Sequence, residues 1–595
     1  MNLWQKINIF FTKSELKKLV FLFVGMLIMA LFETIGVTTI VPFIAVVVSP
    51  ELIYENIYLA QIYNFFSFES DTNFIIFLGV VLITILLISN IFQAFMVWII
   101  TYFTNMQGCR LSVRLLENYL KKPYGFFLLR NTSELGKNVL TEVERVTTGI
   151  FMQSLLILSK IVVAIFLFLL LLFVNPLIAI SLTILLGGIY SIIFKIVKHR
   201  LHFIGGATTE ENFNRFKVAN EAMSGIKEIK LHSSEKEFIR RFLLPAKKLA
   251  IFGSQKILIA SLPRYFLEVI AFGGIVAIII FLLASSNGMD NSIIPVISLY
   301  VMAGYRLMPA LQQIYSSLTN LKFNIPAFEY LLKEFTNSTN EKKEQVKQSS
   351  LPFNKKLQIN KLKFTYEESE TSVLNNLNLT IHPNTTVGLV GSTGSGKTTL
   401  IDLILGLHTP ESGDITLDGL AINNENILAW QKNIGYVPQS IYLTDDTILA
   451  NIAFAISSDE ISIEKVKKAA KMANLHEFIK TLPEGYQTIV GERGVRLSGG
   501  QCQRIGIARA LYNNPKVLIL DEATSSLDSV TENAIMDAIQ NLSHKKTIII
   551  IAHRLSTLVE CDVIHMLLNG KIIDSGSYTQ LIENNKEFRK MSKNL

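Results

Sequence analysis

Residues 386–398 read Thr-Val-Gly-Leu-Val-Gly-Ser-Thr-Gly-Ser-Gly-Lys-Thr, and this stretch decides the fold of the C-terminal half. The segment Thr386–Val390 predicts a strand, and the residues after Thr398 predict an apolar helix. Between a strand and a helix, the glycines let backbone N–H groups converge on a phosphate. Lys397 supplies positive charge, and the Thr398 hydroxyl can hold Mg²⁺. The stretch therefore predicts a phosphate-binding loop in an α/β domain.

A second apolar strand, Val517–Leu520, ends in the carboxylate pair Asp521 and Glu522. Ligands of parallel α/β sheets bind at the carboxyl ends of the strands. Asp521 suits Mg²⁺, and Glu522 suits the attacking water, because a proton acceptor must lie within hydrogen-bond reach of that water. The alternative is two solvated acids at the end of a strand. The pair alone leaves both interpretations open.

The pentapeptide Leu497-Ser-Gly-Gly-Gln501 precedes this strand and resembles the signature sequence of ABC ATPases. The resemblance extends over the whole chain in order, and it implies a P-loop ATPase domain that uses ATP and Mg²⁺. Ser498, Gly499 and Gly500 open a helix whose N-terminus can bind a γ-phosphate only if another subunit presents it. The resemblance therefore implies a dimer with each ATP between two cassettes. One intact cassette per chain favours a homodimer, with a heterodimer as the alternative.

The same resemblance assigns further residues to the ATP site. Tyr366 looks like the aromatic residue that stacks on adenine, and Gln439 looks like the glutamine that contacts Mg²⁺. Asp528 lies in the D-loop pattern, and His553 matches the switch histidine that contacts the γ-phosphate. Gly491-Glu-Arg-Gly494 resembles the X-loop of exporters. A lone histidine after a strand is usually structural, so His553 is a candidate through the resemblance alone.

The predicted site residues form three groups. The ATP-binding residues are Tyr366, Gly391, Ser392, Thr393, Gly394, Ser395, Gly396, Lys397, Thr398, Thr399, Gln439, Ser498, Gly499, Gly500, Gln501 and Asp528. The catalytic residues are Glu522, His553 and Gln439, and the Mg²⁺ ligands are Thr398, Gln439 and Asp521.

The N-terminal half has the composition of a membrane protein. Half of all residues are hydrophobic and 17% are charged, and the apolar runs lie almost entirely before about Ile325. The net charge of +8 is not gathered in one stripe, which argues against a nucleic-acid partner. Three scattered cysteines exclude a disulfide framework or a cysteine metal cluster. We expect a transmembrane domain at 1–335, a linker at 336–352 and the ATPase domain at 353–595.

Six segments are apolar enough to cross a bilayer, which takes about 20 residues each. They are 17–49, 73–103, 148–174, 177–196, 258–284 and 292–325. No Lys or Arg lies between Lys18 and Arg110 or within Tyr265–Tyr305, whereas Arg110–Arg145 and Lys195–Arg264 are rich in both. Because cytoplasmic loops collect basic residues, we expect both termini and the ATPase domain in the cytosol.

The two basic loops are predicted to be long helical extensions of the spans. Each is broken by a turn, at 121–125 and at 223–226. With these turns the loops resemble the coupling helices of ABC exporters, which dock on the ATPase domain in that family. Ordinary charged loops are the alternative.

Charges inside a membrane are costly and often functional. Five occur in the predicted spans: Glu33, Lys160, Arg264, Glu268 and Arg306. The rise per residue places Lys160 and Arg306 in the inner half of the bilayer and Arg264 near its inner boundary. These three cations predict a site for an anionic head group such as a pyrophosphate. Pairing with Glu33 and Glu268, or a position in cytosolic extensions, is an equally weighted alternative.

Segments Pro263–Glu268 and Tyr305–Pro309 look like parts of bacterial lipid-linked oligosaccharide flippases, and the aromatic external segment 51–66 fits an amphipathic surface helix or a packed loop. The resemblance implies a multi-pass protein of the bacterial cytoplasmic membrane that flips a polyprenyl-pyrophosphate oligosaccharide. Alternatives are an exporter of drugs, peptides or other lipids, and a regulatory ABC protein that carries nothing. Intact Glu522 and His553 argue against the last of these.

Overall fold

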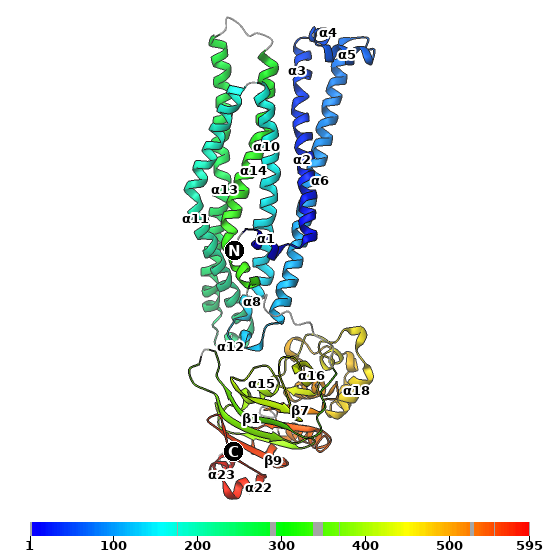
Figure 1. Cartoon of the computed structure of the whole chain (residues 1–595), viewed down its shortest axis with the longest axis vertical. Coiled ribbons are helices and arrows are strands. Elements are labelled where there is room, and N and C mark those ends of the chain that lie inside the picture. Colours follow the sequence, from blue (N-terminus) through cyan, green and yellow to red (C-terminus); the bar gives the residue numbers. More distant parts are fainter. Residues whose placement is uncertain are drawn as a thin grey trace. The chain divides into compact units, whose positions relative to one another are not determined.

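The computed structural model describes residues 3–174, 176–285, 293–336, 349–367, 369–523, 529–552 and 554–593. The chain forms two compact units, shown in Figure 1. The first comprises Met1–Lys122 and Phe126–Lys342, and the second comprises Pro123–Gly125 and Lys343–Leu595. The first is helical and the second contains two β-sheets with helices, so the predicted fold class is confirmed.

Long helices dominate the first unit. They are α2 (Lys13–Thr38), α6 (Asp71–Leu120), α10 (Met152–Val174), α11 (Pro176–Ser224), α13 (Glu235–Ser285) and α14 (Ile293–Thr336). The shorter helices are α1 (Leu3–Phe10), α3 (Ile40–Val48), α4 (Leu52–Glu55), α5 (Ile57–Phe65), α7 (Tyr124–Leu128), α8 (Thr132–Lys137), α9 (Val143–Val146) and α12 (Ile226–Leu231). Two π-helical turns, η1 (Asn138–Glu142) and η2 (Thr147–Phe151), join α8, α9 and α10 into one helical run.

Three helical stretches of the described residues are long and apolar enough to cross a membrane: Lys13–Val48, Asp71–Leu120 and Thr132–Val174. They contain the first three predicted spans, except for residue 49. The other three predicted spans lie on α11, α13 and α14, which have 49, 51 and 44 residues. Residues 286–292, which hold most of the turn predicted to be external and the first residue of the last span, lie outside the described residues. Buried side chains of α2, α6, α10 and α14 pack into one core, and Figure 1 shows α2 beside α6 and α10 beside α14.

Both predicted turns in the basic loops are present. Helix α6 ends at Leu120 before α7 begins at Tyr124, and α11 ends at Ser224 before α12 begins at Ile226. The helices extend well beyond the apolar segments, because polar residues on the same helical periodicity continue them. The long extensions predicted from the sequence are therefore confirmed.

A buried ionic cluster fastens these extensions together. Glu142, on η1, is fully buried and accepts a hydrogen bond of 2.9 Å from Arg145. Lys137 lies 3.6 Å from the other Glu142 oxygen, and Arg145 also donates to Thr209 of α11 at 2.8 Å. Helices α11 and α14 touch here, since a Cβ at Gly205 would lie 2.0 Å from a backbone carbonyl of α14. Removing one member would leave a buried charge without its partner.

The second unit contains two sheets. The antiparallel sheet has the order β2 (Leu374–Ile381), β1 (Leu357–Phe364), β4 (Ser412–Leu417) and β5 (Leu420–Ala421). The larger sheet has the order β10 (Lys571–Gly576), β9 (Val563–Leu568), β3 (Thr386–Val390), β8 (Thr547–Ile551), β7 (Val517–Asp521) and β6 (Ile434–Val437). Strands β9, β3, β8, β7 and β6 are mutually parallel, so their carboxyl ends meet at one edge.

Helices cover this sheet. Those that position the site are α15 (Lys397–Ile404), α20 (Gly499–Leu511) and α21 (Ser529–Gln540). The remaining α-helices are α16 (Ile427–Gln431), α17 (Ile448–Ile452), α18 (Ile463–Met472), α19 (His476–Thr481), α22 (Tyr578–Asn584) and α23 (Lys586–Lys593). Every residue of β3, β7 and β8 is buried, as near-continuous apolar runs in a covered parallel sheet require.

Candidate active site

The loop between β3 and α15 has the geometry of a phosphate cradle. Gly394 and Gly396 have φ of 79° and 101°, which side chains other than glycine rarely adopt. A Cβ at Gly396 would also lie 2.7 Å from Leu374. Lys397 begins α15 and donates to the carbonyl oxygens of Gly391 at 2.7 Å and Ser392 at 3.1 Å. The loop therefore wraps around the ammonium group at a helix N-terminus.

The predicted loop residues divide into two sets by exposure. Ser392, Thr393, Gly394 and Thr398 are exposed, whereas Ser395, Gly396, Lys397 and Thr399 are buried. The Ser395 hydroxyl is buried without a hydrogen-bond partner among the described residues. We infer that the exposed set faces ligand, while the buried set shapes the loop.

Three predicted residues meet at the ends of β6 and β7. The Gln439 side chain donates to the Glu522 carboxylate at 2.6 Å, and Tyr436 of β6 donates its hydroxyl to Asp521 at 3.2 Å. Burial raises the pKa of Asp521, and the Glu522 charge adds to this rise, while Tyr436 and Lys397 oppose it. Burial lowers the pKa of Lys397, against the pull of the Glu522 and Asp521 carboxylates. The loop and the carboxylate pair therefore form one electrostatic unit.

Glu522 has a strained backbone. Its φ is 50°, in the left-handed region, and its N–H donates to the carbonyl of Ile551 on β8 at 3.1 Å. Such a conformation costs on the order of 1–3 kcal/mol and persists only where the surroundings fix it. The turn directs the chain away from the sheet directly after the Asp521 carboxylate.

These side chains suit Mg²⁺. A carboxylate from Asp521, a hydroxyl from Thr398 and an amide oxygen from Gln439 are hard oxygen donors, and Mg²⁺ is usually held by one or two carboxylates together with substrate phosphates. Among the described residues, no group of three or more His, Cys, Asp or Glu side chains could hold a metal ion. The site fits a metal that arrives with a nucleotide.

Tyr366 lies beside the start of α15. Its hydroxyl is 3.0 Å from the Thr399 hydroxyl, and its ring meets Phe364 edge-on with centroids 5.0 Å apart. The ring is half-buried and also meets His408 edge-on, with centroids 5.6 Å apart.

The signature residues cap α20. The Ser498 hydroxyl accepts from the Gln501 N–H at 3.3 Å, and the Gln501 side chain accepts from the Ser498 N–H at 2.9 Å. Ser498 and Gly499 are exposed and Gly500 is buried. This capping box satisfies two donors within the turn and leaves the helix N-terminus open to an anion presented from outside.

Asp528 and His553 lie outside the described residues. The two residues that flank His553 are anchored: Ala552 donates its N–H to the carbonyl oxygen of Leu389 at 3.3 Å, and Arg554 pairs with Glu532 of α21. Sequence reasoning missed Tyr436, Arg554 and Glu532. The position of Arg554 directly after His553 was the one available signal.

Four of the five charged residues in the predicted spans are paired. Arg306 of α14 lies 3.6 Å from Glu33 of α2, whose side chain is 5% exposed. Arg264 and Glu268 pair at 2.7 Å on exposed turns of α13. Lys160 is half-buried on α10 and makes no ion pair within the described part of the chain. The pairing alternative therefore holds for Arg264 and Arg306.

The segment 51–66, which is predicted to be external, is both packed and exposed. Tyr54 donates its hydroxyl to Asp71 at 2.7 Å, and Tyr63 packs against Phe68 and Phe74. Helix α5 has no buried residue, and Phe65 is 82% exposed. Figure 1 places α4 and α5 at the ends of α3 and α6.

Known proteins resemble both units. The family description "ABC transporter transmembrane region" matches residues 39–307, and "ABC transporter" matches residues 374–525. The chain is 31% identical over 480 residues to the heterocyst differentiation ATP-binding protein HepA of Nostoc sp.. The match covers 80% of this chain and 77% of HepA. This chain belongs to the ABC transporter family. Within that family it is an exporter, in which a transmembrane domain and an ATP-hydrolysing domain are joined to make a translocase.

Two further likenesses refine the place of this ABC transporter. It is 35% identical over 401 residues to an ATP-dependent lipid A-core flippase of Saccharophagus degradans, covering 67% of this chain and 66% of the flippase. Its fold matches the structure of a bacterial Atm1-family ABC exporter with ATP bound, at a TM-score of 0.77 and 22% identity, over 98% of this chain and 99% of the other. The second likeness establishes the exporter fold.

Proposed function

We propose that this ABC exporter uses ATP hydrolysis to flip a lipid-linked oligosaccharide of the polyprenyl-pyrophosphate type across the bacterial cytoplasmic membrane. It acts as a homodimer, with both termini and the ATPase domain in the cytosol. The transmembrane domain spans 1–335 and the ATPase domain 353–595, with a linker at 336–352.

The observation that best supports a lipid cargo is the length of one sequence match. The second unit's main segment, Lys343–Leu595, is shorter than the 401 residues that match the lipid A-core flippase. That match therefore includes part of the membrane unit, which is the part that selects cargo. The HepA match, at 480 residues, extends further still, but its name states no cargo.

Each of the site residues has a different proposed role in ATP hydrolysis. Lys397 and the loop N–H groups hold the phosphates, and Tyr366 stacks on the adenine. Glu522, held 2.6 Å from Gln439, accepts a proton from the attacking water. His553 and the partner's signature residues contact the γ-phosphate. Thr398, Gln439 and Asp521 would hold Mg²⁺, which would offset phosphate charge when bound.

The anionic head group is proposed to meet Lys160, Arg264 and Arg306. Lys160 is the strongest of these candidates, because no carboxylate among the described residues neutralises it. Arg264 is exposed on one side of its pair with Glu268, with a side chain 61% exposed. Arg306 would have to bind the head group while it remains paired with Glu33.

ATPase activity in nanodiscs tests the proposal, with Glu522→Gln as the blank. We expect a polyprenyl-pyrophosphate oligosaccharide to stimulate hydrolysis, and reconstituted vesicles to move that lipid between leaflets only with ATP. Robust hydrolysis that amphipathic drugs or peptides stimulate, while the lipid does not, would instead indicate a drug or peptide exporter.

A further inference from the structure

An ion pair lies behind the carboxylate that is proposed to activate water. Arg554, in the turn after β8, donates to Glu532 in the first turn of α21. The Glu532 side chain is 12% exposed, and its second oxygen is buried without a hydrogen-bond partner among the described residues. Arg554 therefore supplies the charge that compensates this buried carboxylate, and it joins the end of β8 to α21.

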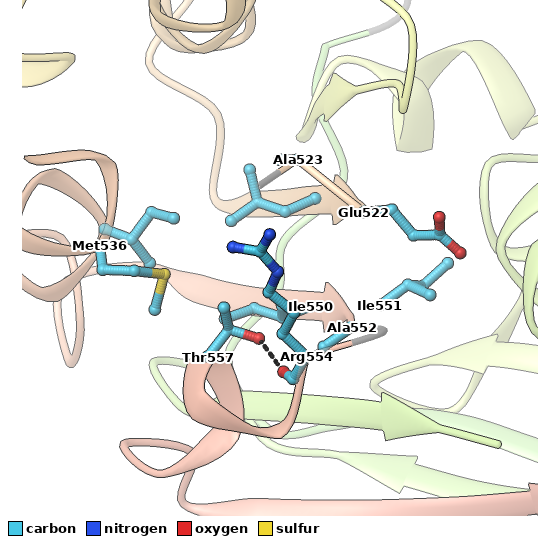
Figure 2. Close-up of a pocket in the computed structure, with 10 residues that line it drawn as sticks. Glu522, Ala523, Met536, Ile550, Ile551, Ala552, Arg554 and Thr557 are labelled. Atoms are coloured by element: carbon cyan, nitrogen blue, oxygen red, sulfur yellow. Dashed lines mark hydrogen bonds between the residues drawn. The ribbon is translucent and has the colours of Figure 1, made fainter. Parts of the chain in front are cut away.

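The same arginine lines a small cavity beside Glu522. A cavity of about 10 Å³ is lined by the ends of β7 and β8, by Met536 of α21 and by Arg554. Figure 2 shows the Arg554 guanidinium among these side chains, with the Glu522 carboxylate directed away from it. Arg554 and Glu522 therefore line one cavity without an ion pair between them among the described contacts.

The Glu522 turn depends on the two elements that this pair joins. Its N–H is bonded to Ile551 at the end of β8, and buried Ala523 after it lines the same cavity as Met536 of α21. A residue at a φ of 50° keeps that conformation only if its surroundings fix it. The Arg554 backbone is itself held, because its carbonyl accepts from the Thr557 hydroxyl at 2.7 Å, as Figure 2 shows.

We propose that Arg554 and Glu532 form a positioning pair: by clamping α21 to the end of β8, they hold the Glu522 turn in its strained conformation and keep ATP hydrolysis fast. Neither residue is proposed to touch nucleotide. The inference rests on ATP hydrolysis within the proposed function and is independent of the cargo.

A double-mutant cycle on the full chain in nanodiscs tests the pair. Arg554→Gln and Glu532→Gln are each expected to lower kcat for ATP about 10-fold or more, with KM changing less than about 3-fold. Because the two residues act through each other, the double variant should be no slower than the slower single variant. The matched control is the exposed pair Lys480 and Glu477, 2.9 Å apart, whose Gln variants should keep the parent kcat.

Three results would overturn the proposal that this pair positions Glu522. They are single variants within about 2-fold of the parent kcat, losses that multiply in the double variant, and a kcat loss that only tracks the fraction of protein still able to bind a fluorescent ATP analogue. If the proposed ATP hydrolysis itself is wrong, the parent protein will hydrolyse ATP no faster than Glu522→Gln. That result is distinct from a failure of the pair proposal.

Discussion

At the scale of single residues, Glu522 combines two properties that rarely occur together. It is an acid within hydrogen-bond reach of an amide, and it has a left-handed backbone that an unbranched residue tolerates only at a cost. A base must point toward its water, and a sharp turn at the strand end provides that direction.

Replacing Glu522 by Gln is expected to lower the rate of ATP hydrolysis about 100-fold or more, because the proton acceptor is lost while shape and hydrogen bonding remain. ATP binding, measured with a fluorescent analogue, should stay within a few-fold of the parent. Full turnover by this variant would remove Glu522 from the role of base.

Replacing Arg306 by Ala is expected to destabilise the membrane unit by about 3–5 kcal/mol, because buried Glu33 loses its partner. Thermal unfolding in nanodiscs measures this change. The double variant Arg306→Gln with Glu33→Gln should regain most of the stability and still lack stimulation by the lipid. If the double variant also regains stimulation, Arg306 serves only the fold.

The loop from Gly391 to Thr398 and the acids Asp521 and Glu522 could be predicted from sequence, because each is set by a short contiguous pattern. The sequence offered Glu33 and Glu268 as partners for the cations but did not say that Arg306 pairs with Glu33, and it gave no sign of the Tyr436–Asp521 contact, because both join residues far apart in the chain. A sequence shows that a buried charge needs a partner, but only the packing of helices or strands selects which one.

At the scale of elements, α15 carries a titrating acid in its interior. Asp402 is 9% exposed, and burial together with the Asp521 charge raises its pKa from 3.8 to about 6. The folded state therefore binds this proton more tightly than the unfolded state. Its contribution to stability is full below about pH 3.8 and is lost as the pH rises through about 6.

Asp402→Asn is therefore expected to raise the unfolding temperature of the ATPase unit at pH 7.5, where the parent carries an unfavourable buried charge. At pH 5 the two proteins should differ less. Differential scanning fluorimetry at both pH values measures this, with exposed Asp459→Asn as the control. An equal shift at both pH values would contradict the assignment.

The boundaries of helices and strands could be predicted from the sequence where neighbouring residues alone determine a turn. Strand β3 begins and ends as predicted, and the breaks after Leu120 and Ser224 lie in the predicted turns. The π-helical turns η1 and η2 were not predicted, because such turns are rare and occur as single turns inside α-helices.

At the scale of the whole molecule, the exposed N-terminus of α20 and the phosphate loop are the two halves of the proposed ATP site, contributed by different copies of the chain. This arrangement makes a prediction about mixtures. A chain with Lys397→Ala and a chain with Ser498→Arg should each hydrolyse ATP poorly alone.

Equal mixing of these two chains before reconstitution is expected to restore measurable hydrolysis. Roughly half of the dimers would then be mixed, and each mixed dimer would hold one site with both defects and one intact site. Hydrolysis of the mixture that is no greater than the mean of the two separate samples would argue against composite sites.

The two π-helical turns give the run from Thr132 to Val174 a tolerance for altered length. A π turn holds one residue more than an α turn, so losing a single residue there restores ordinary helix and leaves the flanking side chains on their original faces. Losing a residue elsewhere would rotate everything beyond it by about 100° and displace Lys160 from its present side of α10. In a series of one-residue deletions along this helix, we therefore expect the protein to tolerate deletions within η1 and η2 and to be damaged by deletions elsewhere.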